Sequence, residues 1–222
     1  MEILTSYEAE RLEMVRTQLR ARGIRDERVL GAMASVPRHE FVRSGQAQAA
    51  YEDRALPIGA WETISQPYIV ALMTEAVAVR PGDRVLEVGT GSGYQAAILA
   101  HLGARVWTME RNPKLAAEAR RRLEDLGYAS SVELLVGDGS AGYPAAAPYD
   151  AILVTAAALR VPPALLDQLA DGGRLVMPVG APSGQDLQLI VKTGDRTITR
   201  NLVPCQFVPL LGEDGRPAAG RG

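Results

Sequence analysis

The sequence predicts an α/β fold: a doubly wound, mostly parallel sheet with helices on both faces and an antiparallel C-terminal part. Three observations indicate this. Short apolar runs alternate with helical patterns from residue 83 to residue 180. The first of these runs ends in a glycine turn that opens a helix. After residue 180 the helical patterns stop while strand patterns continue. The 222 residues are enough for one sizeable hydrophobic core.

The first eighty residues are expected to be largely helical. Ser6 is placed to cap a helix that ends at Gly23, and Asp26 to cap a second helix that stops before a proline. Residues 37–66 show no sustained periodicity, and Pro67 suits the first position of a helix that runs to residue 79. The apolar positions expected to face the core are Leu12, Val15 and Leu19 in the first helix and Val29, Leu30 and Met33 in the second.

Strand and helix signals alternate in the rest of the chain. The strand segments are short apolar runs bounded by turn residues, and Asn112 and Pro113 mark a helix start. The expected strands are 84–88, 104–110, 132–136, 149–155, 173–179, 186–192, 197–202 and 205–210, and the expected helices between them are 94–102, 113–126 and 162–170. We therefore expect a helical and loop subdomain over 1–82, a sheet core over 83–211, and a disordered tail over 212–222 rich in Gly, Pro, Ala and Arg.

The spacing of the glycines in the turn after the first core strand indicates which class of ligand it binds. A dinucleotide fingerprint, G-x-G-x-x-G, would need a third glycine where Tyr94 stands. The run instead reads E-x-G-x-G-x-G, the pattern of Rossmann-like methyltransferases that use S-adenosyl-L-methionine (SAM). A glycine turn that binds nothing is the alternative. The residues expected to hold SAM here are Glu87, Gly89, Thr90, Gly91, Ser92 and Gly93.

Two further acids follow the next two strands. Glu110 ends the second strand, about twenty residues after Gly89, where a carboxylate can accept both ribose hydroxyls. Asp138 and Gly139 follow the third strand, where a carboxylate can accept from an adenine amino group. Each acid alone could be a solvated strand end, but three acids at successive strand ends favour a nucleotide site. The expected cofactor is SAM, with S-adenosyl-L-homocysteine as its product.

A second candidate site precedes the helix opened by Pro67. Thr63, Ser65 and Gln66 lie directly before it. A helix N-terminus offers unpaired N–H groups and a partial positive charge, so with two hydroxyls it makes a cradle for a carboxylate. A plain helix cap by Ser65 or Gln66 is the alternative.

Several motifs together resemble the protein-L-isoaspartate O-methyltransferase family over roughly residues 6 to 211. The Thr-Ile-Ser-Gln-Pro run is the most specific of them, since other SAM enzymes lack it. The matching segments are 37–42 (PRHEFV), 51–59 (YEDRALPIG), 63–67 (TISQP), 85–95 (VLEVGTGSGYQ), 137–139 (GDG), 148–152 (PYDAI), 162–180 and 207–210 (FVPL).

The resemblance implies methyl transfer from SAM to the side-chain carboxylate of L-isoaspartyl residues in damaged proteins and peptides, which initiates their repair. It implies Ser65 as the catalytic residue that orients this carboxylate, with Thr63, Ile64 and Gln66 binding the substrate. The chain departs from the family pattern at 60–62, where Ala-Trp-Glu replaces an aromatic or His, Gly and Gln. This departure alters the loop beside the substrate.

The composition of the chain limits the kinds of partner and cofactor that we expect it to bind. The net charge of −2 gives no field that attracts nucleic acid or an anionic membrane, and no apolar run approaches membrane-spanning length. Neither histidine has a second metal ligand at suitable spacing, so no metal is expected. We expect a cytoplasmic monomer. The alternatives are a SAM enzyme acting on a small molecule or RNA, one acting on an aspartate of a dedicated peptide, and a non-catalytic SAM-binding protein.

Overall fold

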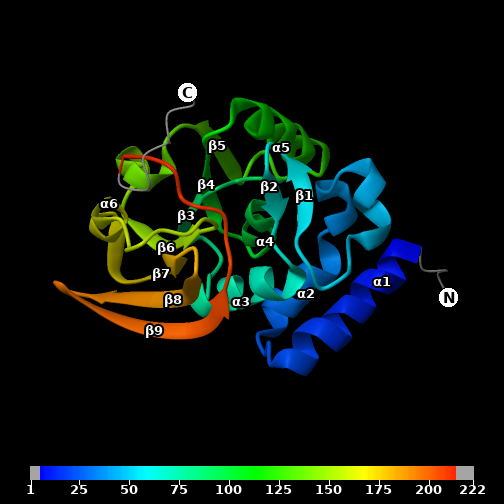
Figure 1. The fold of residues 1–222 in the computed structure, drawn as a ribbon, viewed down its shortest axis with the longest axis horizontal. Helices are drawn as coiled ribbons and strands as arrows, with labels where there is room; N and C mark the ends of the chain where they lie inside the picture. The colour runs from blue at the N-terminus through cyan, green and yellow to red at the C-terminus, as the bar shows by residue number, and fades with distance from the viewer. Residues whose placement is uncertain (1–5, 214–222) are drawn as a thin grey trace.

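The fold is built on one large sheet (Figure 1). The computed structural model describes residues 6–213. Their seven-stranded sheet has the order β5-β4-β3-β6-β7-β8-β9, and a separate two-stranded sheet pairs β1 with β2. The expected α/β architecture is therefore confirmed. Of the tail expected over 212–222, residues 214–222 lie outside the described part of the chain.

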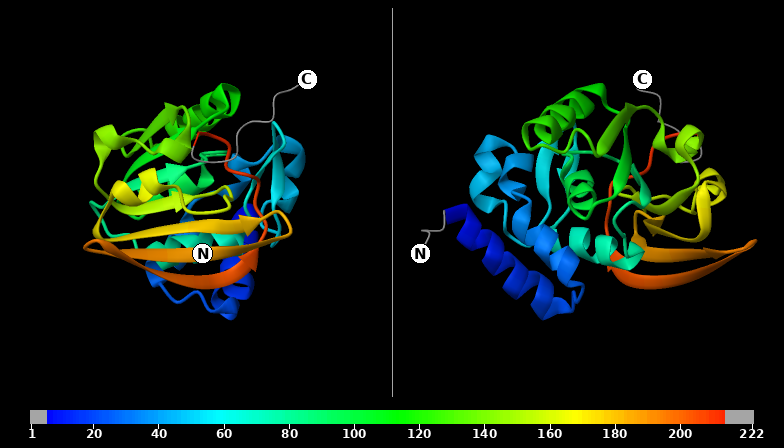
Figure 2. Two further views of the ribbon diagram at one scale, coloured as in Figure 1. Left: turned by 60° about the vertical axis from the view of Figure 1, so that its left-hand side comes forward. Right: turned by 180° about the vertical axis from the view of Figure 1, so that it is seen from behind.

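Five strands run parallel and two close the sheet antiparallel. The four central pairings β3–β4, β3–β6, β4–β5 and β6–β7 are parallel, while β7–β8 and β8–β9 are antiparallel. The last three strands, β7 to β9, are longer than the others and extend from one side of the molecule (Figure 2). The bounds are Arg84–Val88 for β3, Arg105–Glu110 for β4, Val132–Val136 for β5, Tyr149–Val154 for β6, Leu169–Ala181 for β7, Gly184–Thr193 for β8 and Arg196–Cys205 for β9.

The first helix is less regular than its sequence suggests. It is α-helical over α1 (Ser6–Met14), widens to a π-helical turn over Val15–Leu19, and ends in a 3₁₀ turn before Gly23, whose φ is 99°. Leu12 is 44% exposed, so its expected place in the core was wrong. The Ser6 hydroxyl donates to Glu10 instead of capping the helix from outside. Met14, Val15 and Leu19 are buried, so the core-facing side of this helix passes through Met14 rather than Leu12.

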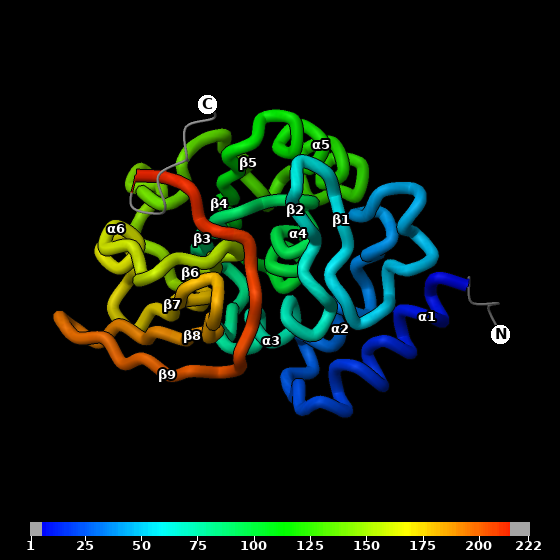
Figure 3. Tube along the Cα trace, in the orientation of Figure 1, coloured from blue at the N-terminus to red at the C-terminus, as the bar shows by residue number. Residues whose placement is uncertain are grey.

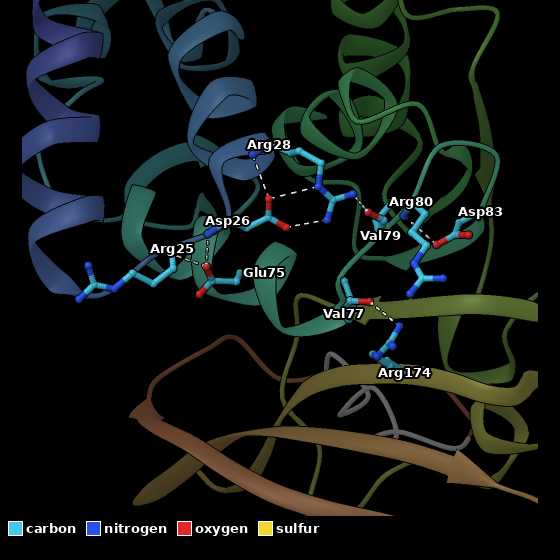
Figure 4. Close-up of polar contacts among 9 residues, drawn as sticks. All are labelled: Arg25, Asp26, Arg28, Glu75, Val77, Val79, Arg80, Asp83 and Arg174. Carbon is cyan, nitrogen blue, oxygen red and sulfur yellow. Dashed lines mark hydrogen bonds and ion pairs between the residues drawn. The ribbon is translucent and has the colours of Figure 1, made fainter.

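The next two helices follow their predicted starts. Asp26 caps α2 (Glu27–Ser35) by accepting from the Arg28 amide, and Pro67 opens α3 (Pro67–Val77). The Glu75 carboxylate, which accepts from the Arg25 and Asp26 amides, and the Arg28 guanidinium join the start of α2 to the end of α3 (Figure 4). Arg28 Nη1 donates to the Val79 carbonyl at 2.9 Å. These contacts fix the N-terminal helices against the helix that leads into the sheet.

The stretch 37–66 is more ordered than its sequence indicates. It holds two 3₁₀ turns and the hairpin of β1 (Leu56–Gly59) and β2 (Glu62–Ile64). Leu56 pairs with Ile64 and Pro57 with Thr63. Strands of four and three residues are too short to show the alternation that identifies a strand in a sequence.

Two predicted elements near the C-terminus differ from the structure. The helix expected over 162–170 is confined to α6 (Pro163–Asp167), because Leu169 and Ala170 already belong to β7. Residues 206–210 form no strand beyond an isolated bridge between Pro209 and Ala157, and Cys205 is the last residue of β9 rather than the first of a further strand. The remaining helices, α4 (Tyr94–His101) and α5 (Pro113–Asp125), lie where they were expected, and Asn112 caps the second of them.

The sheet separates two apolar clusters, because alternate residues of each strand face opposite sides. Val85 and Val106 face the cluster that holds the apolar faces of α2, α3, α4 and α5. Leu86 and Trp107 face the second cluster, covered by α6 and the turns around Ala146. Among residues 6–213, α3, α4 and α5 contact the strands on one side and α2 packs on α3 and α4, while the short α6 packs on the other side. No helix among residues 6–213 is long and apolar enough to cross a membrane.

Candidate active site

A cavity of about 540 Å³ opens at the carboxyl ends of β3, β4 and β6. The segments that line it include the end of the β1–β2 hairpin, the glycine turn after β3, and the C-terminal segment 203–211. We call residues 62–66 the acceptor loop and residues 89–93 the glycine loop. The C-terminal segment runs from the end of β9 past the strand ends, close to the acceptor loop (Figure 3). Ligands of doubly wound sheets bind at this edge.

The glycine loop is held tightly against β6. Gly89 has φ = 97°, and a Cβ there would lie 2.3 Å from the Thr155 Oγ1. The Thr155 hydroxyl lies 2.7 Å from the Gly89 carbonyl, to which it donates. A side chain at position 89 is therefore excluded both by backbone conformation and by contact.

Glu110 supports the same loop from β4. Its Oε2 accepts from the Gly91 amide at 2.9 Å, and its Oε1 accepts from the Asn112 amide at 2.8 Å. Glu110 lines the cavity and is 7% exposed. Each carboxylate oxygen can accept a second hydrogen bond, so both remain able to bind ribose hydroxyls.

Glu87 places a buried polar atom in the cavity wall. Its Oε2 accepts from the Thr108 hydroxyl at 2.5 Å, and the Thr108 and Thr90 hydroxyls lie 2.6 Å apart. Its Oε1 is buried without a hydrogen-bond partner among the described residues. A buried polar atom left unpaired is costly, so this atom is suited to a hydrogen-bonding group of a bound molecule. With Glu110 and the glycine loop it forms a donor and acceptor set that fits SAM.

Burial gives Glu87 a pH signature that can be measured. Burial, partly offset by the Thr108 hydroxyl, raises the pKa of Glu87 from 4.5 to about 8. The folded state therefore keeps a proton that the unfolded state releases between about pH 4.5 and 8, so stability falls as pH rises through this window. Glu87→Gln cannot ionise and lacks this loss, of up to about 1.4 kcal/mol per pH unit. Urea unfolding of both proteins at pH 5, 6.5 and 8 checks this expectation, and parallel profiles would contradict it.

The Ser65 side chain, in the acceptor loop, does not cap helix α3. Ser65 and Thr63 line the cavity. No side chain caps α3, and among residues 6–213 no hydrogen bond to the Ser65 hydroxyl is formed. The Ser65 carbonyl, in contrast, accepts from Arg38 at 2.7 Å. The plain-cap alternative for Ser65 and Gln66 is therefore wrong, and the hydroxyl stays available for a ligand.

The structure brings most of the site residues predicted from the sequence into the lining of one cavity. Gly93 and Asp138 do not line the cavity. Gly93 starts α4 beside Leu123, and the Asp138 carboxylate accepts from the Ser140 amide and hydroxyl and from the Glu213 amide. The predicted residues that line it are Thr63, Ile64, Ser65, Gln66, Glu87, Gly89, Thr90, Gly91, Ser92, Glu110 and Gly139.

The sequence did not reveal the third wall. Residues 203–211 lie more than one hundred residues from the glycine loop in the chain, and the family-like run at 207–210 (FVPL) did not mark them as part of a site. Cys205 lies in this wall, and burial raises the pKa of its thiol to about 11. The thiol is therefore protonated at neutral pH and is no nucleophile. Among residues 6–213 no three His, Cys, Asp or Glu side chains cluster as metal ligands do.

The chain was compared with known proteins. Residues 10–215 match the model of the protein-L-isoaspartate(D-aspartate) O-methyltransferase family. The protein-L-isoaspartate O-methyltransferases of Methanoculleus marisnigri and Methylorubrum populi are 57% and 58% identical to this chain. The first alignment covers 93% of both proteins, and the second covers 92% of this chain and 96% of the relative.

Solved structures of the same family are also similar to this chain. A protein-L-isoaspartate O-methyltransferase superposes with a TM-score of 0.81 at 31% identity, over 91% of this chain and 66% of that one. A β-aspartate methyltransferase from Plasmodium falciparum, in complex with S-adenosyl-L-homocysteine, gives a TM-score of 0.79 at 25% identity, over 90% of this chain and 98% of that one. This chain therefore belongs to the protein-L-isoaspartate(D-aspartate) O-methyltransferase family.

Proposed function

We propose that this chain transfers a methyl group from SAM to the free carboxylate of L-isoaspartyl residues in damaged proteins and peptides, and so starts their repair. One observation carries the proposal: the acceptor loop and the glycine loop line the same cavity. In this arrangement the subdomain 1–82 supplies the acceptor side and the core 83–211 supplies the donor side.

The reaction needs alignment more than acid–base chemistry. The sulfonium of SAM supplies an activated methyl group. The acceptor carboxylate is ionised at pH 7, so no residue has to remove a proton from it. We assign to Ser65 the donation of a hydrogen bond that orients the carboxylate, with Thr63, Ile64 and Gln66 shaping its pocket. Glu87, Glu110 and the glycine loop hold the donor, and the segment 203–211 excludes water from the reacting groups.

Matched peptides test this proposal. The protein is incubated with methyl-labelled SAM and two peptides that differ only in carrying an isoaspartyl or an aspartyl residue. We expect base-labile label on the isoaspartyl peptide alone, followed by loss of methanol as the ester cyclises to a succinimide. Equal labelling of both peptides would favour a different acceptor, and SAM binding without labelling would favour a non-catalytic protein.

The hairpin tip beside the acceptor loop distinguishes this chain from the family pattern. Ala60 and Trp61 have φ values of 51° and 64°, a region that bulky side chains rarely adopt. The Trp61 side chain is 97% exposed. Glu62 lines the cavity, and its burial and the nearby Glu110 raise its pKa. The Glu62 carboxyl group therefore lies in the cavity that we propose for a negatively charged substrate.

Restoring the family pattern should therefore favour isoaspartyl substrates. We expect Trp61→Gly with Glu62→Gln to lower the KM for an isoaspartyl peptide about 3- to 10-fold, because glutamine removes a like charge worth about 1 kcal/mol. Glycine also relieves the backbone at position 61, so Tm should rise slightly. Steady-state kinetics at saturating SAM check this, with each single variant as control. An unchanged or higher KM in the double variant would show that this departure does not weaken substrate binding.

For the wider context we propose a cytoplasmic monomer whose partners are isoaspartyl-containing proteins and peptides. Nucleic acid and membranes are not proposed partners, because the net charge of −2 provides no attraction to polyanions.

A further inference from the structure

Arg38 is a fully buried arginine behind the acceptor loop. It begins the 3₁₀ turn Arg38–Phe41, and its side chain is 0% exposed. Its Nε donates to the Ala50 carbonyl and its Nη2 to the Ser65 carbonyl, both at 2.7 Å. Its Nη1 has no hydrogen-bond partner among residues 6–213, and no described carboxylate lies within ion-pair distance.

Such an arginine is costly for folding. Burial lowers the pKa of Arg38 to about 10, so the guanidinium still carries its charge at neutral pH. A buried charge without an acidic partner costs free energy that an apolar residue of similar size would not. Stability alone therefore does not account for an arginine at this position.

Its contacts connect the two halves of the active site. The Arg38 guanidinium carbon lies 5.0 Å from the centre of the Tyr94 ring, and Tyr94 follows the glycine loop directly. Ser65 and Tyr94 both line the cavity. The guanidinium thus lies between the acceptor residue on one side and the start of α4 on the other.

The acceptor loop has few other restraints on this side. Pro67 has no N–H to donate, and no side chain caps the start of α3. The only side chain among the described residues that donates to the Ser65 carbonyl is Arg38. Losing this bond would free rotation of the peptide between Ser65 and Gln66, and with it the direction of the Ser65 side chain.

We propose that Arg38 is a positioning residue for methyl transfer, which holds the Ser65 carbonyl and so directs the Ser65 hydroxyl toward the acceptor carboxylate. This inference rests on the proposed function for its kinetic consequence, but its structural consequence is independent of activity. A lysine can keep the charge and reach one of the two carbonyls; a methionine can do neither.

Variants with a matched control test the proposal. Arg38→Met should lower kcat/KM for an isoaspartyl peptide about 10-fold and Arg38→Lys about 3-fold, while the Kd for SAM stays within 2-fold. The control is Arg174→Met, since Arg174 donates to the Val77 carbonyl at the other end of α3 (Figure 4) and lies outside the cavity wall. We expect it to leave activity unchanged. An active Arg38→Met enzyme, or equal losses of SAM affinity and activity, would overturn the proposal.

A double-mutant cycle separates positioning from general damage. If Arg38 acts through the Ser65 hydroxyl, Arg38→Lys should cost about 3-fold in the wild type and almost nothing in a Ser65→Ala background. The same fold-loss in both backgrounds would contradict the inference.

Hydrogen exchange gives a readout that needs neither catalysis nor the methionine variant. The backbone amides of residues 62–66 and 68 should exchange at least 10-fold faster in Arg38→Lys than in the wild type, and at the wild-type rate in Arg174→Met. Unchanged exchange in Arg38→Lys would overturn the role of Arg38 whatever the substrate is. A wild-type protein that fails to methylate the isoaspartyl peptide would instead contradict the proposed function.

Discussion

Replacing Ser65 by alanine is expected to lower kcat/KM for an isoaspartyl peptide about 10- to 100-fold. The hydroxyl lies in the cavity wall, has no hydrogen-bond partner among residues 6–213, and is the group that we assign to the acceptor carboxylate. Its loss should remove one hydrogen bond to a charged carboxylate, worth about 1–3 kcal/mol. SAM affinity should change little. Rates at saturating SAM and calorimetry with SAM measure the two effects separately.

Stability controls make the Ser65 result interpretable. Because no side chain caps α3, Ser65→Ala should leave Tm within about 2 °C of the wild type, the shift expected for a loss well under 1 kcal/mol. Ser35→Ala is the matched control, since Ser35 is exposed on α2 and its hydroxyl donates only to the Gly31 carbonyl. Full turnover by Ser65→Ala would show that this hydroxyl does not hold the substrate carboxylate. Loss of SAM binding in step with activity would place Ser65 on the donor side instead.

Replacing Glu110 by alanine is expected to weaken SAM binding about 10- to 100-fold. Two effects act together. The ribose hydroxyls lose a charged acceptor, at a cost of about 1–3 kcal/mol. The Gly91 amide also loses the carboxylate that anchors the glycine loop. Since both effects concern donor binding, kcat at saturating SAM should fall less than affinity.

A smaller change at the same position separates the two effects. Glu110→Gln keeps one acceptor oxygen but no charge, so its Kd for SAM should lie between those of the wild type and Glu110→Ala. Glu118→Ala serves as the control, because Glu118 is exposed on α5 and pairs with Arg122 outside the cavity. Titration calorimetry measures all four proteins. An unchanged Kd in Glu110→Ala would exclude Glu110 as the ribose ligand.

Local signals account for the parts of this protein that its sequence predicts well. The parallel strands β3 to β6 (84–154) lie within two residues of their expected bounds, since each is an apolar run closed by turn residues. The caps at Asp26 and Asn112 form as expected, because a cap involves residues two or three apart. The glycine spacing and the Thr-Ile-Ser-Gln-Pro run identify the donor and acceptor loops for the same reason: each motif is contiguous.

Contacts between segments that are distant in the sequence determined the features that the sequence did not predict. Asp138 lies outside the cavity wall, and its carboxylate accepts from Ser140 and from the amide of Glu213, 75 residues away. Residues 206–210 line the cavity rather than forming a strand, although the composition of 205–210 suits a strand. The helix expected over 162–170 is cut short because pairing with β6 draws Leu169 into β7. In each case tertiary pairing overrode a weak local preference.

The sequence alone established the sheet core, the glycine loop and the acceptor loop, because short-range patterns of apolar, glycine and capping residues encode them. Only the tertiary structure established that these loops face one cavity, that residues 203–211 form its third wall, and that the Arg38 guanidinium lies behind Ser65. Arg38 and Ser65 are 27 residues apart. No periodicity or spacing in a single sequence reports such a contact, because it forms only when the hydrophobic core brings the N-terminal turns against α3 and α4.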